Sequence, residues 1–528
     1  MPMHSMPVSR PATWLPRSVP DRNGEQSAGK VFAGRDDRAV TGLIGKIGMR
    51  MRSSFSIRAM LAVGALAAAF VVVPAGQAHI AAAAGPCTLG GLCAGGEYHP
   101  LTPTRIFDTG DSSVPPINDV APLGGKPLSL AKPTFNIGLL GLGGVPLSGS
   151  DVLAVVVNIT IAQPGVSGWL GAYPSGVAPA DDTSLLNFRS MQTTSNLAVV
   201  RAGADGKLTV KLFGNGAVGA AKARVVVDVF GWISTSTYGT ASDFTGEYRG
   251  ARLVPLAVPT RILDTRNDAA PDTPLGAGTD LSLTVWGATP IDSSGAAAVP
   301  TGSNVVGVVA NITAVAPTRA TFITAQPDSI SVGTPPTTSN LNPAAGQVKA
   351  NLVIVPLDAN GVLHLYNHAG SVNVVVDVIG VLETGTDEAT RKGRIVPLTS
   401  PFRAFDTRQP AFGNVPLGPG QAENWSFANF ASSVTINSTS VGNQLGLLGN
   451  LTVATMMRQY PTVPASSYLT VYPGGGSLPL ASNLNFGEAE AIPNMVMARY
   501  DASQVLQVFN FRGYTHYLLD VSAVILDD

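Results

Sequence analysis

The sequence predicts an all-β protein in which three tandem β-sandwich modules, immunoglobulin-like or jelly-roll in style, follow a signal peptide. Three observations favour this class. The 528 residues include 58 glycines and 40 prolines, and 45% are hydrophobic while only 13% are charged, which is typical of a turn-rich folded chain. Four short motifs recur three times in one order. Segments such as residues 208–212 alternate apolar and polar side chains, the period of a half-buried strand.

The four motifs define the repeat. Each copy opens with Pro-x-Arg-x-x-Asp-Thr and closes with an apolar run that contains one aspartate; Asn-x-Thr and Ser-Asn-Leu-Asn lie between them. In copy one the third motif is degraded to Ser-Leu-Leu-Asn. In chain order the motifs occupy residues 103–109, 157–160, 184–187 and 225–229 in copy one, 259–265, 310–313, 339–342 and 374–378 in copy two, and 401–407, 449–452, 482–485 and 517–521 in copy three.

The motif spacing divides the chain into copies of roughly 135–140 residues, a normal domain size. A single β-propeller is the alternative, but copies of this length exceed one blade. We expect short polar linkers to separate the modules like beads. The predicted parts are an unstructured or misassigned start (1–48), a signal peptide (49–84), a cysteine-containing linker (85–97), three β modules (98–233, 248–382 and 394–528) and the linkers between them (234–247 and 383–393).

Strand and turn signals agree with this division. Residues 152–161 form a β-branched run, which indicates a strand buried on both faces. Ala-Asp-Gly-Lys at 204–207 and Asp-Ala-Asn-Gly at 358–361 indicate hairpin turns between apolar segments.

The signal peptide is predicted from a basic segment, an apolar run at residues 60–73 and small residues after it. The run is short for a transmembrane helix, so we expect cleavage and secretion; retention as an anchor is the alternative. We expect no membrane span after cleavage. The protein is thus expected to be extracellular, in the medium or at the cell surface.

Cys87 and Cys93 are the only cysteines. In an exported chain they are predicted to form a disulfide. Two thiolates without neighbouring histidines or carboxylates leave a zinc shell half filled, so no metal is predicted there. The net charge of −1 gives no electrostatic reason to expect nucleic acid as a partner.

The motif set resembles a tandem module, R-x-L-D-T-R, N-V-T, S-N-L-N and V-V-D-V-x-G, of uncharacterised exported proteins of actinobacteria and some other soil bacteria. The resemblance covers nearly all of residues 98–527 and implies a secreted β-rich repeat protein without assigning catalytic residues. Copy one departs from it at Gly110, where the other copies have Arg266 and Arg408.

Candidate catalytic groups argue against an enzyme. Asp108 heads a single Asp-Thr-Gly loop, whereas an aspartic protease needs two. His364 and His368 lack the helix and the intervening glutamate of a zinc protease, and leave at most a weak surface metal. We therefore predict no catalytic residue, no metal site and no cofactor, with a hydrolase as a disfavoured alternative.

The repeated polar residues are predicted to be structural. A lone carboxylate inside an apolar strand is unfavourable, so each aspartate of the last motif should pair with the arginine of the first, in a buried arrangement without an open pocket. Asp108 should brace the following turn. The asparagines of Asn-x-Thr should satisfy buried backbone groups rather than bear glycans. These residues are Arg105 with Asp228, Arg261 with Asp377, Arg403 with Asp520, and Asn158, Asn311 and Asn450.

Two classes of function remain. We favour a structural or adhesive protein of the bacterial cell exterior, with cell-wall or host glycans or other surface proteins as partners. A carbohydrate-binding protein is the alternative, because aromatic rings stack on sugars and Trp169, Phe322 and Tyr468 share one repeat position. Exposure of Trp169 beside Tyr173 would favour it. The candidate glycan contacts are Trp169, Tyr173, Tyr468 and Tyr472.

Overall fold

The computed structural model describes 15 stretches of the chain: residues 71–72, 94–109, 128–149, 151–177, 183–214, 222–235, 238, 249–267, 273–291, 296–331, 334–385, 390–436, 439–454, 466–487 and 491–528. The only helical elements among them are η2 (Pro410–Phe412) and α1 (Ala428–Ser433). Neither has the length and apolar character needed to cross a membrane.

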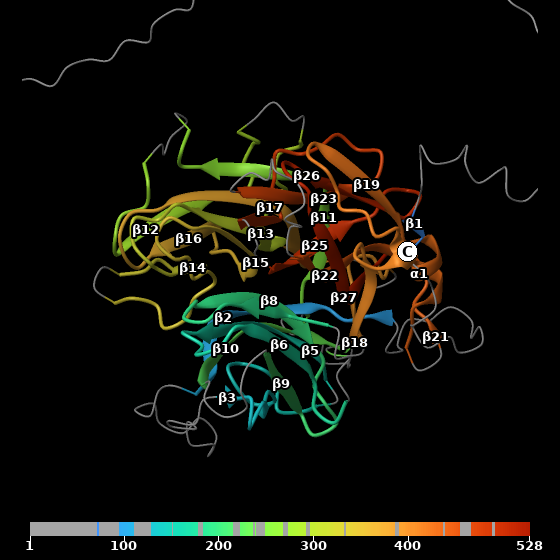
Figure 1. Cartoon of the computed structure of the whole chain (residues 1–528), viewed down its shortest axis with the longest axis horizontal. Helices are drawn as coiled ribbons and strands as arrows, with labels where there is room; N and C mark the ends of the chain where they lie inside the picture. Colours follow the sequence, from blue (N-terminus) through green and yellow to red (C-terminus); the bar gives the residue numbers. More distant parts are fainter. Residues whose placement is uncertain are drawn as a thin grey trace, which may run out of the picture. The chain divides into compact units, whose positions relative to one another are not determined.

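Nearly all described strands belong to six small antiparallel sheets, two from each copy (Figure 1). The first sheet of copy one has the strand order β2 (Tyr98–Asp108), β10 (Lys222–Ser234), β5 (Val152–Ala162), β8 (Thr194–Val200), and β3 (Leu128–Ser129) also pairs with β10. The second sheet of copy one has the order β4 (Thr134–Gly138), β9 (Lys207–Gly214), β6 (Gly168–Pro174), β7 (Leu186–Phe188).

Copies two and three repeat this order, except that the second sheet of copy two has three strands. The sheets of copy two run β11 (Arg252–Asp264), β17 (Asn373–Glu383), β13 (Val305–Val315), β15 (Val348–Pro356), and β12 (Thr279–Thr284), β16 (Val362–Asn367), β14 (Ile323–Gln326). Those of copy three run β18 (Ile395–Asp406), β27 (His516–Leu526), β22 (Gln444–Ala454), β25 (Ile492–Arg499), and β19 (Gln421–Ser426), β26 (Val505–Asn510), β23 (Ser466–Pro473), β24 (Leu484–Gly487). A small pair, β20 (Thr435–Ile436) and β21 (Thr439–Ser440), and the parallel strand β1 (Val71–Val72) on β19 complete the set.

The first sheet of each copy has a central strand, β5, β13 or β22, that is buried on both faces. Strand β5 is buried along nearly its whole length, as its β-branched sequence predicts, whereas the second-sheet strand β12 alternates exposed and half-buried residues. The edge strands β8, β15 and β25 contact one another (Figure 1). The all-β prediction is therefore confirmed, but the six sheets form a propeller-like arrangement and not clearly three tandem sandwiches.

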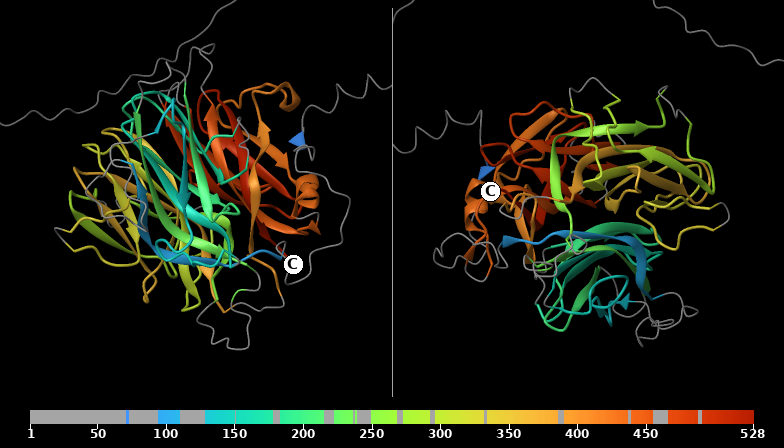
Figure 2. Two further views of the ribbon diagram at one scale, coloured as in Figure 1. Left: turned by 90° about the horizontal axis from the view of Figure 1, so that it is seen from below. Right: turned by 180° about the vertical axis from the view of Figure 1, so that it is seen from behind.

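Separate beads do not describe the packing. One hydrophobic core contains residues from all three copies, among them Leu197, Val353 and Met495 on the three contacting edge strands. Figure 2 shows the copies side by side from two further directions. Other copies cover first-sheet faces that would be exposed to water in an isolated module. The copies therefore stabilise one another.

The starts of the three copies also meet. Glu97, Arg252 and Arg394 each stand three residues before the proline of their opening strand. The buried Glu97 carboxylate lies 3.1 Å from Arg252, 3.6 Å from Arg249 and 3.9 Å from Arg394. Backbone bridges join residue 96 to 395 and residue 98 to 251. One carboxylate thus serves guanidinium groups from two other copies.

Strand register aligns three motifs in one row. Arg105 faces Asp228 across β2 and β10, and Asp228 faces Asn158 across β10 and β5. The same row recurs in the other copies, as Arg261, Asp377 and Asn311, and as Arg403, Asp520 and Asn450.

Candidate functional site at the seams between copies

The structure brings each predicted arginine and aspartate together. Arg261 grips Asp377 with Nε and Nη2 at 2.7 and 3.1 Å, and Arg403 grips Asp520 at 2.8 and 3.0 Å. Arg105 donates Nε to Asp228 at 2.9 Å. Two parallel hydrogen bonds fix the relative position of the paired strands in copies two and three.

The aspartate of the first motif braces its turn through a second arginine. Asp264 accepts hydrogen bonds from the backbone N–H of Arg266 at 3.2 Å and from its side chain at 2.7 and 2.6 Å. Burial raises the pKa of Asp264, but the hydrogen bonds and charge of Arg266 and the charge of Arg261 outweigh it and hold the pKa below its usual value. Asp406 and Arg408 behave in the same way.

Copy one supplies this second arginine from another strand. Position 110 is glycine, but Arg224 on β10 grips Asp108 at 2.8 and 2.7 Å. The residues at the register position of Arg224 in the other copies are Asn373 and His516. The departure of copy one from the motif of copies two and three is therefore compensated within the fold.

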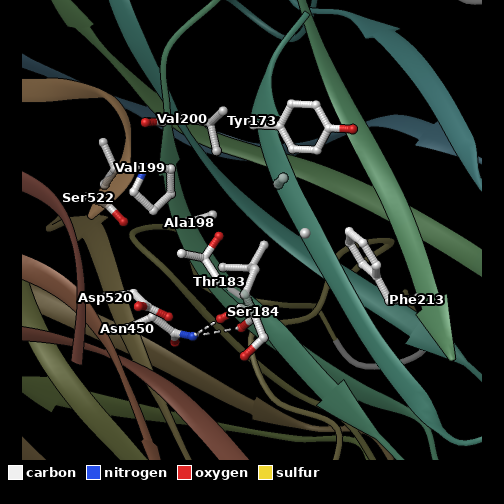
Figure 3. A pocket seen from close by; sticks show the side chains of 15 residues that line it. Tyr173, Thr183, Ser184, Ala198, Val199, Val200, Phe213, Asn450, Asp520 and Ser522 are labelled. Atoms are coloured by element: carbon white, nitrogen blue, oxygen red, sulfur yellow. Dashed lines mark hydrogen bonds between the residues drawn. The ribbon is translucent and has the colours of Figure 1, made fainter. Parts of the chain in front are cut away.

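The second and third motifs join neighbouring copies. The Nδ2 of Asn158 donates to the Ser339 carbonyl of copy two at 2.6 Å. Asn311 donates in the same way to Ser482 of copy three, and Asn450 donates to Ser184 of copy one at 2.5 Å (Figure 3). The contacts run head to tail and close on themselves. We call the three contact surfaces seams 1–2, 2–3 and 3–1.

The Arg–Asp row also reaches across a seam. In seam 2–3, Asp377 Oδ2 accepts the backbone N–H of Ser482 at 3.1 Å, and Arg261 Nη2 donates to the Leu480 carbonyl at 3.1 Å. All four motifs therefore meet at this seam. The sequence predicts the contacts within a copy but not those between copies.

A second set of buried asparagines lies in the seams, on the edge strands. Each side chain donates to the Asn-x-Thr asparagine of another copy and to a carbonyl of its own third motif. These residues are Asn196, Asn351 and Asn494. Their constant position, 11 residues after the second residue of the third motif, is the sequence signal that could have revealed them.

The candidate glycan contacts divide into two groups. Tyr173 and Tyr472 are buried, so Trp169 and Tyr173 are not exposed side by side. Trp169 and Tyr468 are half-buried. Each stacks on a second ring, as does their equivalent Phe322. The pairs are Trp169 with Phe213 at 5.2 Å, Phe322 with His368 at 4.4 Å and Tyr468 with Phe511 at 4.7 Å.

Two seams contain cavities of different size. The cavity in seam 3–1 has about 30 Å³ and lies between Tyr173 and Phe213 of copy one and Asn450 and Asp520 of copy three (Figure 3). The cavity in seam 1–2 has about 220 Å³ and is lined by Arg105. The expectation that no pocket opens beside an Arg–Asp pair is therefore wrong for copy one, because the neighbouring copy covers its arginine only in part.

The remaining candidates are accounted for separately. His364 is bound to Asp280 at 2.9 Å, whereas His368 stacks on Phe322. Within the part of the chain that the structure describes, no three metal-ligating side chains cluster. Cys87, Cys93 and the predicted signal peptide lie outside the described residues, except for the two residues of β1.

Comparisons with known proteins give little. No known family and no curated protein matches the sequence. Among solved structures, the CBM22 tandem domain from Paenibacillus barcinonensis covers 52% of this chain and 99% of its own, with 10% identity and a TM-score of 0.15. The structure of Sulfolobus Turreted Icosahedral Virus covers 76% of this chain and 86% of its own, with 9% identity and a TM-score of 0.14. At such TM-scores, the likenesses establish neither a shared fold nor a function.

Proposed function

We propose that this chain is a secreted, non-catalytic protein of the bacterial cell exterior with a structural or adhesive role, in which three β-sandwich modules close into one ring. The observation that carries the proposal is the use of the repeated polar residues. The recurring arginines, aspartates and asparagines bond to one another within and between copies. A catalytic group must reach a substrate, whereas Asp377, Asn311 and Ser482 face each other in a buried seam.

A closed ring suits adhesion because it holds three similar surfaces at fixed separation. Weak contacts made by each copy then add as one multivalent attachment. The second sheets of the three copies provide such surfaces.

Glycan binding is the second candidate, and the aromatic pairs favour it. One pair lies at the same position in each copy, and none of the six rings belongs to the three hydrophobic core clusters. A half-exposed ring that the core does not need is suited to stack on the apolar face of a sugar.

Fractionation and binding of the secreted chain test both candidates. Antibody detection should find the protein in the medium or cell-wall fraction, and the purified chain should bind whole cells or insoluble polysaccharide. Replacing Trp169, Phe322 and Tyr468 together by alanine should weaken this binding at least about tenfold, since each aromatic contact contributes roughly 1 kcal/mol. The control replaces three exposed apolar residues outside the pairs, Leu147, Met191 and Val415, by alanine.

A protein confined to the cytoplasm would contradict the proposal, as would a hydrolytic activity lost in Asp108→Asn. Surface binding that survives the aromatic triple variant would leave adhesion in place and overturn glycan binding through these rings.

A further inference from the structure

The threonine of the Asn-x-Thr motif has a hydroxyl group that the fold does not use. Thr160, Thr313 and Thr452 are only 6%, 3% and 2% exposed. Their Oγ1 atoms form no hydrogen bond with any group that the structure describes. A buried hydroxyl without a partner is unfavourable, and a ligand group beside it would supply the missing hydrogen bond.

In seam 1–2 this threonine lines the 220 Å³ cavity. Thr193 of copy one and Thr337 and Asn342 of copy two add polar groups to the wall, and the ring of Phe322 forms part of it. The cavity thus combines an aromatic ring with several hydrogen-bonding groups. Few polar groups placed around an apolar surface are typical of small-molecule sites.

The cavity is open because one contact of seam 2–3 has no equivalent here. In seam 2–3, Arg261 bonds to the Leu480 carbonyl, and its side chain is 9% exposed. The residue equivalent to Leu480 in seam 1–2 is Thr337, and Arg105 does not bond to it, although the structure describes both. The Arg105 side chain is 30% exposed and lines the cavity instead.

Charge and size restrict the ligand. Arg105 and Arg224 both line the cavity, but Asp228 and Asp108 balance their charges. An ionic ligand is therefore not favoured. The volume lies below the roughly 300–1,000 Å³ of sites for drug-sized molecules, so a single small ring fits better than an extended oligomer.

We propose that the cavity of seam 1–2 binds one neutral sugar ring of a glycan. Phe322 stacks on the apolar face of the ring, Thr160 bonds to one hydroxyl, and Arg105 with Asn342 holds neighbouring hydroxyls. This inference deepens the glycan-binding candidate above and rests on it. Seam 3–1, with its cavity of only about 30 Å³, serves as the internal comparison.

The test adds four free sugars, glucose, galactose, mannose and N-acetylglucosamine, one at a time to the full secreted chain. Saturation-transfer NMR and titration measure their binding. At least one sugar should bind saturably. Thr160→Val should weaken its binding about tenfold, the effect of one lost hydrogen bond. Thr313→Val and Thr452→Val are matched controls, because they remove the same unpartnered hydroxyl at the other seams, and they should bind as the unmodified chain does. All three variants should melt alike, since no protein hydrogen bond is lost.

Phe322→Leu should abolish binding of the sugar, because the ring that stacks on it is lost. Tyr468→Leu should bind the sugar as the unmodified chain does. The inference is overturned if none of the four sugars binds, or if Thr160→Val binds as tightly as Thr313→Val. Polysaccharide binding that depends on Trp169 and Tyr468 but not on Thr160 would refute the seam cavity and preserve glycan binding. Absence of binding to every sugar and polysaccharide would refute both.

Discussion

The Arg–Asp pairs of copies one and two share one motif but differ in their surroundings. Arg261 makes two bonds to Asp377 and one to the next copy, and its side chain is 9% exposed. Arg105 makes one bond to Asp228, and its side chain is 30% exposed. The motif thus specifies the pairing of two strands, whereas the neighbouring copy decides how deeply the pair is buried.

The pKa values of Asp228 and Asp264 shift in opposite directions. Burial raises the pKa of Asp228, and the charge and hydrogen bond of Arg105 offset this only in part. Asp264, held by the side chain of Arg266, has its pKa lowered instead. At Asp264 the hydrogen bonds and charge of Arg266 and the charge of Arg261 outweigh desolvation, whereas at the more deeply buried Asp228 desolvation prevails.

The largest effect should come from breaking the buried pair. Asp377→Ala leaves Arg261 buried without its partner and Ser482 N–H without its acceptor, so the free energy of unfolding should fall by about 3–5 kcal/mol. Asp228→Ala should cost less, about 1–3 kcal/mol, because Arg105 has access to water. Urea denaturation of the secreted chain measures both.

The control is Asp205→Ala, since Asp205 pairs with Lys207 where both side chains are more than 40% exposed, and little change is expected. Equal losses for Asp377→Ala and Asp228→Ala would show that seam burial does not set the strength of the pair.

A smaller effect should follow exchange of the second arginine. Arg224→Asn removes the grip on Asp108 and should lower stability by about 1 kcal/mol, because the Arg224 side chain is 43% exposed. Adding Gly110→Arg should restore the loss, since copies two and three place this arginine there. Thermal melts of the single and double variants measure the rescue; an additive loss would refute the compensation.

Lowering the pH should change the contributions of Asp264 and Asp228 to stability in opposite directions, each by a modest amount. The lowered pKa of Asp264 gives stability that is present above its unfolded value of 3.8 and lost as the pH falls through the folded pKa. The raised pKa of Asp228 acts oppositely, because its ionisation opposes folding as the pH rises from 3.8 through the folded pKa.

Asp264→Asn should therefore reduce the loss of stability on acidification, and Asp228→Asn should increase it. Denaturation curves between pH 5 and 2 compare the slopes. Slopes that shift in the same direction would contradict the assignment.

The smallest change is expected from cutting the chain between copies. A protease site placed within residues 241–246 should give two fragments on a denaturing gel that still elute together in native gel filtration, because the seams hold them. The same cut combined with Asn158→Ala and Asn450→Ala, which remove hydrogen bonds of seams 1–2 and 3–1, should release more of the fragments. Separation of the fragments after the cut alone would support the bead arrangement.

Sequence reasoning reached the contacts that act inside one copy. The β-branched run of β5 revealed burial on both faces, and a charged group in an apolar strand pointed to a partner such as Arg105. The partner of Asn158 was not accessible in this way, because Ser339 lies in another copy and the sequence does not state how copies face each other. The stacking partners of Trp169 and Tyr468 were missed for a similar reason, since strand register decides which rings meet.

The Glu97 cluster makes the three copies non-interchangeable. Copy one contributes an acid where copies two and three contribute Arg252 and Arg394. A ring of three identical copies of the second or third kind would gather three guanidinium groups without a carboxylate, and like charges in a buried place repel strongly. The triplicated gene product has therefore acquired a unique order. A copy can no longer be duplicated, lost or exchanged for another without placing the wrong charge at this junction.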